Sequence, residues 1–309
     1  MTTQTVRIGT RGSQLALWQA NWVKQALENL YPDLKVSLTV IKTSGDKILD
    51  VPLAKVGGKG LFVKEIEQAL MDGDIDLAVH SMKDMPGDIP EPLEIGVVPE
   101  REVPWDVLIS RGHKSFNDLP KGARLGTSSL RRASQVLYRR PDMEVLPLRG
   151  NLDTRLKKLE TEGLDAIILA GAGVKRLELG HVISEMIDPG IILPAVGQGA
   201  LCIEVRKADS RIHELIAPID HVSTHRIIAG ERAFLKRLEG GCQVPMAAYG
   251  QIEGDTLTLE GMVAETDGSI MHHHTVSGAV SRAEAMGREL AETLIERGAD
   301  KILARLSEV

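Results

Sequence analysis

Hydrophobic and polar positions follow the strand period and the helix period in turn through the first two thirds of the chain. Val36, Leu38 and Val40 alternate with polar residues, as a half-buried strand requires. Leu15 and Trp18 share one face of a helix that we expect to begin after Ser13 and to end near residue 30. Similar patterns predict strands at 6–10, 77–79, 123–127, 144–148 and 165–170, and helices at 62–71, 129–140 and 151–160.

The last third of the chain changes character. Residues 223–238 predict a helix, which glycines close. Three strands at 244–253, 256–265 and 270–276 follow, with turns at Gly254 and Gly268, and a last helix begins near Ser281. Because the earlier alternation is typical of parallel sheets with helical crossovers, the chain is predicted to hold two α/β units and a smaller α+β domain.

Composition limits the possible functions. The chain has 309 residues, 43% of them hydrophobic and 26% charged, which is typical of a globular protein with more than one domain. Its formal net charge of −6 argues against a general nucleic-acid-binding protein. The longest apolar run, near 166–172, is shorter than the ~20 residues of a membrane span. We therefore expect a cytoplasmic protein that binds neither nucleic acid nor membrane, without a secretion signal.

Polar and cationic residues follow the predicted strands, where ligands of open α/β sheets bind. Helix N-termini at Ser13, Ser129 and Asn151 would add N–H groups that favour anions. We expect two lobes to face each other across a cleft lined with arginine, which suits carboxylates because its planar group binds both oxygens. The residues concerned are Arg11, Ser13, Asp46, Lys83, Asp84, Ser129, Arg131, Arg132, Arg149, Gly150 and Arg155.

Each of these candidates also has a purely structural interpretation. A solvated helix face is expected for Arg139 and Arg140, which come late in their helix, but less so for Arg131 and Arg132. Asp84 could simply pair with Lys83 on the surface, although it follows a buried strand. The glycine-rich run 57–60 fits a lid or an ordinary loop. Residues 272–274 are three histidines, for which we expect solvated surface and no metal.

The two cysteines lie in different settings and show no metal-ligand spacing. Cys202 lies in an apolar strand and is expected to be a small core residue. Cys242 lies in a glycine-opened loop, where a thiol is accessible for covalent chemistry, although position alone favours a buried structural cysteine.

Seven sequence motifs stand out along the chain. They are 10–16 (TRGSQLA), 53–62 (LAKVGGKGLF), 78–84 (AVHSMKD), 126–132 (GTSSLRR), 148–151 (LRGN), 194–199 (PAVGQG) and 239–245 (EGGCQVP). Together they resemble the porphobilinogen deaminase (hydroxymethylbilane synthase) family, in its bacterial form. The resemblance runs through the first two predicted domains and into the third, and it weakens after about residue 250.

This resemblance implies a three-domain fold whose first two domains are doubly wound lobes like those of periplasmic binding proteins. The first implied domain consists of residues 1–99 together with 197–218, and the second of residues 100–196. The third, residues 219–309, contains a three-stranded antiparallel sheet. The implied enzyme is a monomeric transferase of porphyrin and heme biosynthesis. It would join four porphobilinogen molecules head to tail, release ammonia from each, and free hydroxymethylbilane by hydrolysis.

The resemblance also assigns roles to single residues. A dipyrromethane cofactor would be linked covalently to Cys242, and Asp84 would be the catalytic carboxylate, helped by Lys83 and Arg11. Residues that would hold the carboxylate arms are Ser13, Lys83, Ser129, Arg131, Arg132, Arg149, Gly150, Arg155 and Arg176, and those at the substrate or on a lid are Gln19, Asp46, Lys55, Lys59 and Phe62.

A second interpretation has no enzyme at all. A cytoplasmic two-lobed module that binds a carboxylate would explain the lobes and the arginines equally well. It would give no role to Cys242 or Asp84 and would leave the third domain unexplained.

Overall fold

The computed structural model describes residues 5–47, 60–238 and 244–307, and within these ranges the chain forms two compact units. The first unit consists of Met1–Glu102 and Ala200–His225, and the second of Val103–Gly199 and Arg226–Val309. Each unit is therefore formed by two chain segments that lie far apart in the sequence.

The first unit is built on a five-stranded sheet in the order β2-β1-β3-β10-β4. Its strands are β1 (Thr5–Thr10), β2 (Lys35–Val40), β3 (Leu77–Ser81), β4 (Leu93–Val97) and β10 (Leu201–Arg206), and its helices include α1 (Gln14–Leu30), α2 (Ser44–Lys47), α4 (Lys64–Met71), the short η1 (Met82–Asp84) and α8 (Ser210–Ile216).

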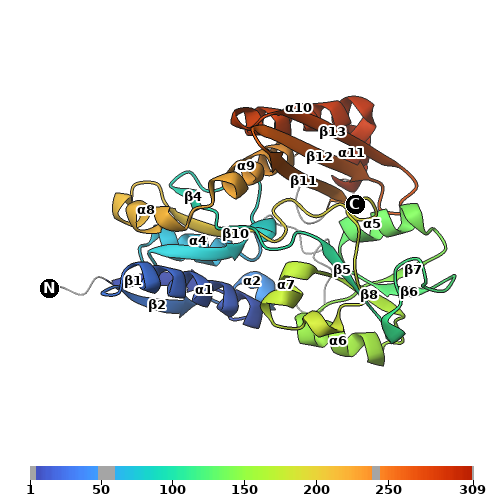
Figure 1. Cartoon of the computed structure of the whole chain (residues 1–309), viewed down its shortest axis with the longest axis horizontal. Helices are drawn as coiled ribbons and strands as arrows, with labels where there is room; N and C mark the ends of the chain where they lie inside the picture. Colours follow the sequence, from blue (N-terminus) through green and yellow to red (C-terminus); the bar gives the residue numbers. More distant parts are fainter. Residues whose placement is uncertain (1–4, 48–59, 239–243, 308–309) are drawn as a thin grey trace. The chain divides into compact units, whose positions relative to one another are not determined.

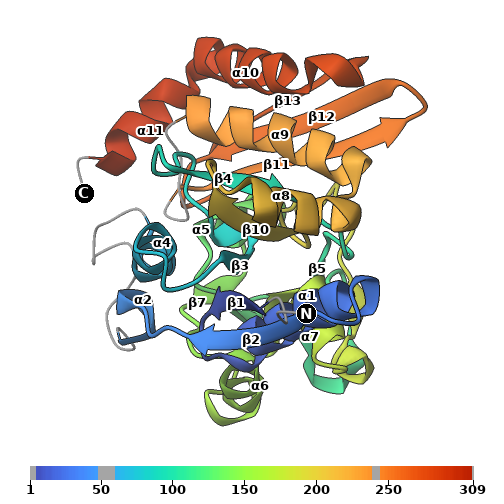
Figure 2. The same ribbon diagram turned by 90° about the vertical axis from the view of Figure 1, so that its left-hand side faces the viewer.

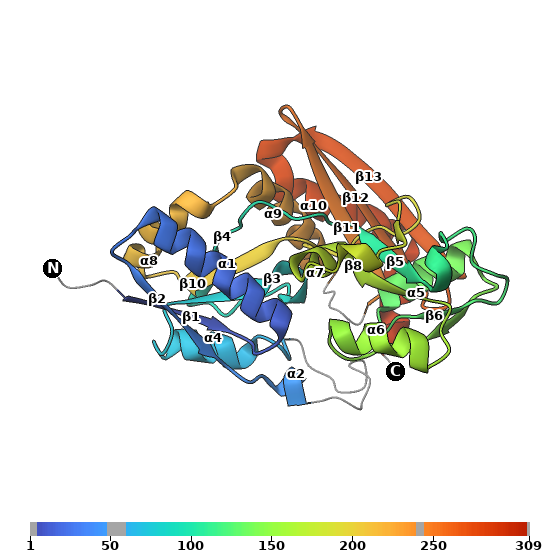
Figure 3. The same cartoon turned by 60° about the horizontal axis from the view of Figure 1, so that its bottom comes forward.

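Helices cover both faces of this sheet, and Figures 2 and 3 show α1 and α4 on opposite sides of it. On one face, Val23 and Leu27 of α1 and Ile212 of α8 pack against Ile8 and Ile203. On the other face, α4 contributes Ile66 and Leu70 to a smaller cluster. The strands at the centre are therefore buried from both sides, which explains their continuous apolar runs.

The second unit repeats this plan in its five-stranded sheet, ordered β7-β6-β8-β5-β9. Val136 of α5 packs on one face, and Leu159 of α6 and Val174 of α7 pack on the other. The elements are β5 (Asp106–Ser110), β6 (Arg124–Gly126), α5 (Leu130–Arg139), β7 (Glu144–Leu146), α6 (Leu152–Thr161), β8 (Ala166–Ala170), α7 (Gly171–Arg176) and β9 (Glu185–Met186).

The C-terminal part of the second unit is the predicted antiparallel meander, β11 (Met246–Glu253), β12 (Thr256–Ala264) and β13 (Met271–Ala279). Figure 1 shows α10 (Ala283–Leu294) lying along one face of it. Phe234 of α9 (Val222–Arg237) and Leu290 of α10 fill that face, together with residues of α11 (Asp300–Ser307). The opposite face packs on Leu193, and Tyr249 stacks edge to face on Trp105 at 4.8 Å.

The predicted fold class is confirmed, but both five-stranded sheets are mixed and not purely parallel as we expected. Strand β10 enters the first sheet between β3 and β4 and runs antiparallel to both. In the second sheet, β5 is antiparallel to β8 and β9. The error arose because β4 and β5 were not among the predicted strands, and because the partner of a strand is not encoded in its own periodicity. The division into three domains stays a prediction.

Candidate functional site

The N-terminus of α1 begins the candidate site in the first unit. Ser13 has an extended backbone, and its hydroxyl accepts a hydrogen bond from the amide of Ala16 at 3.3 Å. This cap satisfies one of the amides that a helix leaves without an internal partner. The predicted cap is therefore confirmed, and it holds the loop that carries Arg11 at the carboxyl end of β1.

Arg11 is oriented by two different groups. Its Nε and NH2 atoms donate to Oδ1 of Asp46, at 3.1 and 2.5 Å, and its guanidinium lies 4.3 Å from the centre of the Phe62 ring. Burial raises the pKa of Asp46, but hydrogen bonds from Arg11 and from Thr43 outweigh it and hold that pKa below its usual value. Asp46 therefore remains a carboxylate that fixes the direction of Arg11.

Phe62 also lies directly against the backbone at Gly45. A Cβ atom added to Gly45 would lie 2.3 Å from the Phe62 ring, and the amide of Gly45 donates to the carbonyl of Leu61 at 2.9 Å. A glycine is thus required at 45 for the ring to lie against the backbone of α2.

A cavity lies between α1, β3 and Phe62. Gln19 and Ser81 close part of its wall through a hydrogen bond of 2.8 Å, and Asp84 of η1 lies at its edge. Within the described part of the chain, Asp84 forms no hydrogen bond or ion pair, including the suggested one to Lys83. The lining residues are Arg11, Ser13, Leu15, Ala16, Gln19, Phe62, Val63, Val79, His80, Ser81 and Asp84.

Behind this cavity lies a buried pair that the sequence did not suggest. Nε2 of His80 on β3 lies 3.1 Å from Oε2 of Glu204 on β10, and both side chains are almost fully buried. Glu67 of α4 lies nearby, and burial followed by the negative charge of Glu204 raises its pKa to about 7. Glu204 is an acidic residue within the apolar run 201–205. It could have indicated a buried partner, since a buried charge needs one.

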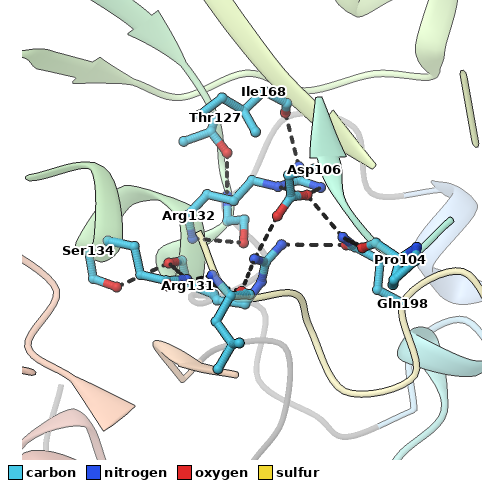
Figure 4. A network of polar contacts seen from close by, with 11 residues as sticks. Pro104, Asp106, Thr127, Arg131, Arg132, Ser134, Ile168 and Gln198 are labelled. Atoms are coloured by element: carbon cyan, nitrogen blue, oxygen red, sulfur yellow. Dashed lines mark hydrogen bonds and ion pairs between the residues drawn. The ribbon is translucent and has the colours of Figure 1, made fainter. Parts of the chain in front are cut away.

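In the second unit, Arg131 and Arg132 both turn inward to one carboxylate, as Figure 4 shows. Arg131 donates to Oδ2 of Asp106 at 2.7 Å, and Nε of Arg132 donates to Oδ1 at 2.9 Å. Asp106 is 0% exposed, and Gln198 also donates to it, at 3.1 Å. One negative charge is thus shared by two cations, so the cluster keeps a net positive charge.

One expectation about the arginines needs correction. Arg131 and Arg132 are buried and not part of a solvated face, as we expected, and Asp106 and the carbonyls of Leu193 and Ile168 occupy several of their donors. Arg140 is not simply solvated either, since its Nε donates to Asp142 at 2.7 Å. The sequence missed Asp106, whose place at the start of a buried strand was the signal for a cationic partner.

The remaining candidates of this unit lie at strand ends and helix starts. Ser129 caps α5, and Arg155 donates to the carbonyl of Gly150 at 2.8 Å. Arg176 is buried and donates to the carbonyl of Gly199 at 2.7 Å, while Arg149 is half-buried beside Gly150. Gly150 has a φ of 113°, which a residue with a side chain rarely adopts.

Some predictions fall on other parts of the chain. Cys242, Lys55 and Lys59 lie outside the described residues. Cys202 is fully buried in β10, which confirms its interpretation as a core residue. Among the described residues, no group of histidine, cysteine, aspartate and glutamate could hold a metal ion, and His273 is exposed and pairs with Glu260 at 2.6 Å. No helix within the described ranges is long and apolar enough to cross a membrane.

Comparison with known proteins agrees with these features. The model of the porphobilinogen deaminase dipyromethane cofactor binding domain matches residues 6–214, and that of the porphobilinogen deaminase C-terminal domain matches 226–296. The porphobilinogen deaminase of Syntrophotalea carbinolica is 57% identical over 99% of this chain and 97% of its own length. The porphobilinogen deaminase of Geobacter metallireducens is 56% identical over 99% of this chain and 96% of its own length.

Solved structures with a related outline include the periplasmic aliphatic sulphonate binding protein SsuA of Escherichia coli. It aligns with a TM-score of 0.42 at 17% identity, covering 75% of this chain and 70% of SsuA. A second structure is the probable amino-acid ABC transporter extracellular-binding protein ytmK of Bacillus subtilis. It aligns with a TM-score of 0.43 at 14% identity, covering 71% of this chain and 90% of ytmK.

Two five-stranded sheets with helices on both faces, followed by an antiparallel C-terminal sheet, place the chain among multidomain α/β proteins. Within that class the matches are specific and extend over nearly the whole chain. The chain belongs to the porphobilinogen deaminase family.

Proposed function

We propose that this protein joins four porphobilinogen molecules head to tail, with loss of ammonia from each, and releases hydroxymethylbilane for porphyrin and heme synthesis. The observation that carries the proposal is the cavity in which Asp84 lies without a partner among the described residues, beside Arg11 and the N-terminus of α1. A carboxylate and a cation on one cavity suit a substrate that bears carboxylates and develops positive charge.

Asp84 is the proposed catalytic carboxylate. When porphobilinogen loses ammonia, its ring becomes an electron-poor azafulvene, and positive charge develops on the pyrrole nitrogen. A carboxylate aimed at that charge lowers the energy of the transition state more than that of the ground state. Arg11 and Lys83 would bind carboxylate arms of the substrate, and Phe62 would pack on a pyrrole ring.

The residues of the first-unit cavity fit a dipyrromethane, because they combine an aromatic ring, a cation and a helix N-terminus. When bound, this cofactor supplies the pyrrole carbon to which the first substrate is added. We propose Cys242 as its covalent attachment point, since a thiolate is the most nucleophilic side chain available. A covalent anchor would keep the lengthening product on the protein between additions.

The cationic residues of the second unit are the proposed holders of further carboxylates. Ser129, Arg131, Arg132, Arg149, Gly150, Arg155 and Arg176 would bind cofactor or product arms, and Gln19, Asp46, Lys55 and Lys59 would shape the substrate site or a lid over it. The net positive charge of the cluster Asp106, Arg131 and Arg132 supports this role, because the incoming carboxylate completes its neutralisation. We further propose that the protein acts as a monomer in the cytoplasm.

One experiment tests the function and separates it from simple carboxylate binding. Purified protein is incubated with porphobilinogen, and hydroxymethylbilane and ammonia are measured, while intact-protein mass reports the bound cofactor. An added mass equal to one dipyrromethane, with formation of both products, supports the proposal. Unmodified protein that binds porphobilinogen without turnover would make the chain a binding module.

A further inference from the structure

His80 lines the same cavity as Asp84 and pairs with Glu204 behind it, and nothing in the function proposed above uses this pair. His80 lies on β3 among the lining residues, and Glu204 reaches it from the neighbouring antiparallel strand β10. We infer that His80, held by Glu204, is the base that accepts the proton released each time a pyrrole ring is joined to the next. This inference rests on the proposed deaminase function and adds a residue to it.

The hydrogen bond between the two residues decides which imidazole nitrogen is basic. Nε2 lies 3.1 Å from Oε2 of Glu204, so an Nε2–H group donates to the carboxylate. Nδ1 then carries the lone pair, and it takes part in no hydrogen bond within the described ranges. A neutral imidazole oriented by a buried carboxylate is the arrangement of a general base, because the carboxylate stabilises the imidazolium that forms.

The charges around the pair support this assignment. Oε1 of Glu204 and Oε1 of Glu67 are both buried and have no hydrogen-bond partner among the described residues. Burial and the charge of Glu204 raise the pKa of Glu67 to about 7, while His80 and Lys64 act in the opposite direction. Arg11 and Asp84 line the same cavity as His80. Carboxyl groups therefore predominate among the charged side chains named around the imidazole.

The reaction needs such an acceptor. The amino group of porphobilinogen is protonated, so the bond between its nitrogen and the methylene carbon breaks with the electron pair leaving as ammonia and positive charge remaining on the ring. The α-carbon of the preceding pyrrole ring then forms a bond to that methylene carbon. Its hydrogen leaves as a proton, and the pair of the C–H bond restores the aromatic ring. The proton passes to Nδ1 of His80, and no oxidant or further reactant is required.

The first test is independent of turnover. Protein labelled with ¹⁵N in histidine is examined by long-range ¹H–¹⁵N NMR, with His80→Gln used to assign the signal. We expect the Nε2–H tautomer for His80, and a shift of the tautomer balance in Glu204→Gln. An Nδ1–H tautomer would overturn the inference, since no lone pair would then be available at Nδ1.

The second test uses porphobilinogen carrying deuterium at its free α-carbon. On cofactor-loaded protein we follow the second and later additions, because only then is the deuterated ring the preceding ring that loses its α-hydrogen. We expect His80→Gln to slow these additions by roughly a hundredfold or more, as for loss of a general base. Because proton removal then limits the rate, the deuterium isotope effect should rise above that of the unmodified protein. The matched control is His225→Gln, which alters a histidine paired with Asp220 at 2.9 Å outside the cavity and should leave both quantities unchanged.

An unchanged isotope effect in His80→Gln, or an equal loss of rate in His225→Gln, would remove His80 from the proton transfer. If His80→Gln does not take up the cofactor, the isotope effect is measured on Glu204→Gln, and an unchanged value there has the same consequence. The unmodified protein serves as the reference for the function itself. If it forms no hydroxymethylbilane, the proposed function fails, whatever the NMR experiment gives for the tautomer.

Discussion

The guanidinium of Arg11 lies 4.3 Å from the centre of the Phe62 ring and donates at the same time to Asp46. The carboxylate sets the direction of the cation, and the ring shields one of its faces from water. A cation–π contact of this kind contributes about 0.5–2 kcal/mol, depending on its solvation. Both residues line the cavity, and Phe62 lies directly against Gly45.

Gly45→Ala should disturb this wall without removing any charge. The new methyl group would lie 2.3 Å from the Phe62 ring, so the ring must move away from Arg11. We expect a loss of about 1–3 kcal/mol in the free energy of unfolding, as for other overpacked sites, and weaker binding of porphobilinogen. Gly180→Ala is the control, because nothing lies within 4 Å of the added atom. Equal stability of the two variants in urea would contradict the packing seen at Phe62.

Asp84→Asn should abolish most of the catalysis while preserving shape. A carboxylate at ~4 Å from a unit charge contributes about 4 kcal/mol at an effective dielectric near 20. If most of this appears only in the transition state, single additions should slow by roughly a thousandfold. Asp84→Glu, with the charge displaced, should give an intermediate rate. A near-normal rate for the Asn variant on loaded protein would show that Asp84 has no part in the chemical step.

Cys242→Ser should fold but carry no covalent cofactor, because a neutral hydroxyl is a much weaker nucleophile than a thiolate. Cys202→Ser is the matched control, since Cys202 is fully buried in β10. It should retain the added mass and lose some stability. Intact-protein mass measures both, and an added mass on Cys242→Ser would place the attachment elsewhere.

Arg132→Leu should lower both stability and cofactor loading. It leaves Asp106, which is 0% exposed, with one cationic partner fewer, and breaking a buried ion pair costs about 3–5 kcal/mol. Arg131→Leu should act in the same way. Arg139→Leu is the control, because Arg139 is exposed and should change stability by no more than about 0.5 kcal/mol. Urea unfolding and intact mass give the two results, and similar losses in all three variants would argue against a specific cluster.

Glu67 predicts a pH dependence of stability. Its pKa is raised from 4.5 to about 7 in the folded protein, so the folded state binds the proton more tightly than the unfolded state. The contribution of Glu67 to the free energy of unfolding is therefore most favourable below pH 4.5. This contribution falls by up to about 3 kcal/mol as the pH rises towards 7. Glu67→Gln does not ionise, so its stability relative to the unmodified protein should increase between pH 5 and pH 8. A constant difference in urea midpoints would contradict this.

Local features of the fold were predictable because neighbouring residues determine them. Ser13, Ser129 and Asn151 cap the helices predicted to follow them, since a cap depends on the side chain and the next three amides. The turns at Gly254 and Gly268 adopt positive φ, as the hairpin pattern required. The motifs that identify the family are likewise contiguous runs of residues.

The sequence by itself thus determined most of the helices and strands, the family and the residue types at the strand ends. Only the tertiary structure decided which of them meet. Glu204 reaches His80 because β10 returns to the first sheet in antiparallel register, and Asp106 pairs with Arg131 and Arg132 because β5 joins the second sheet next to β8. The physical reason is that side-chain periodicity specifies the face a residue occupies, whereas strand pairing depends on packing between distant segments.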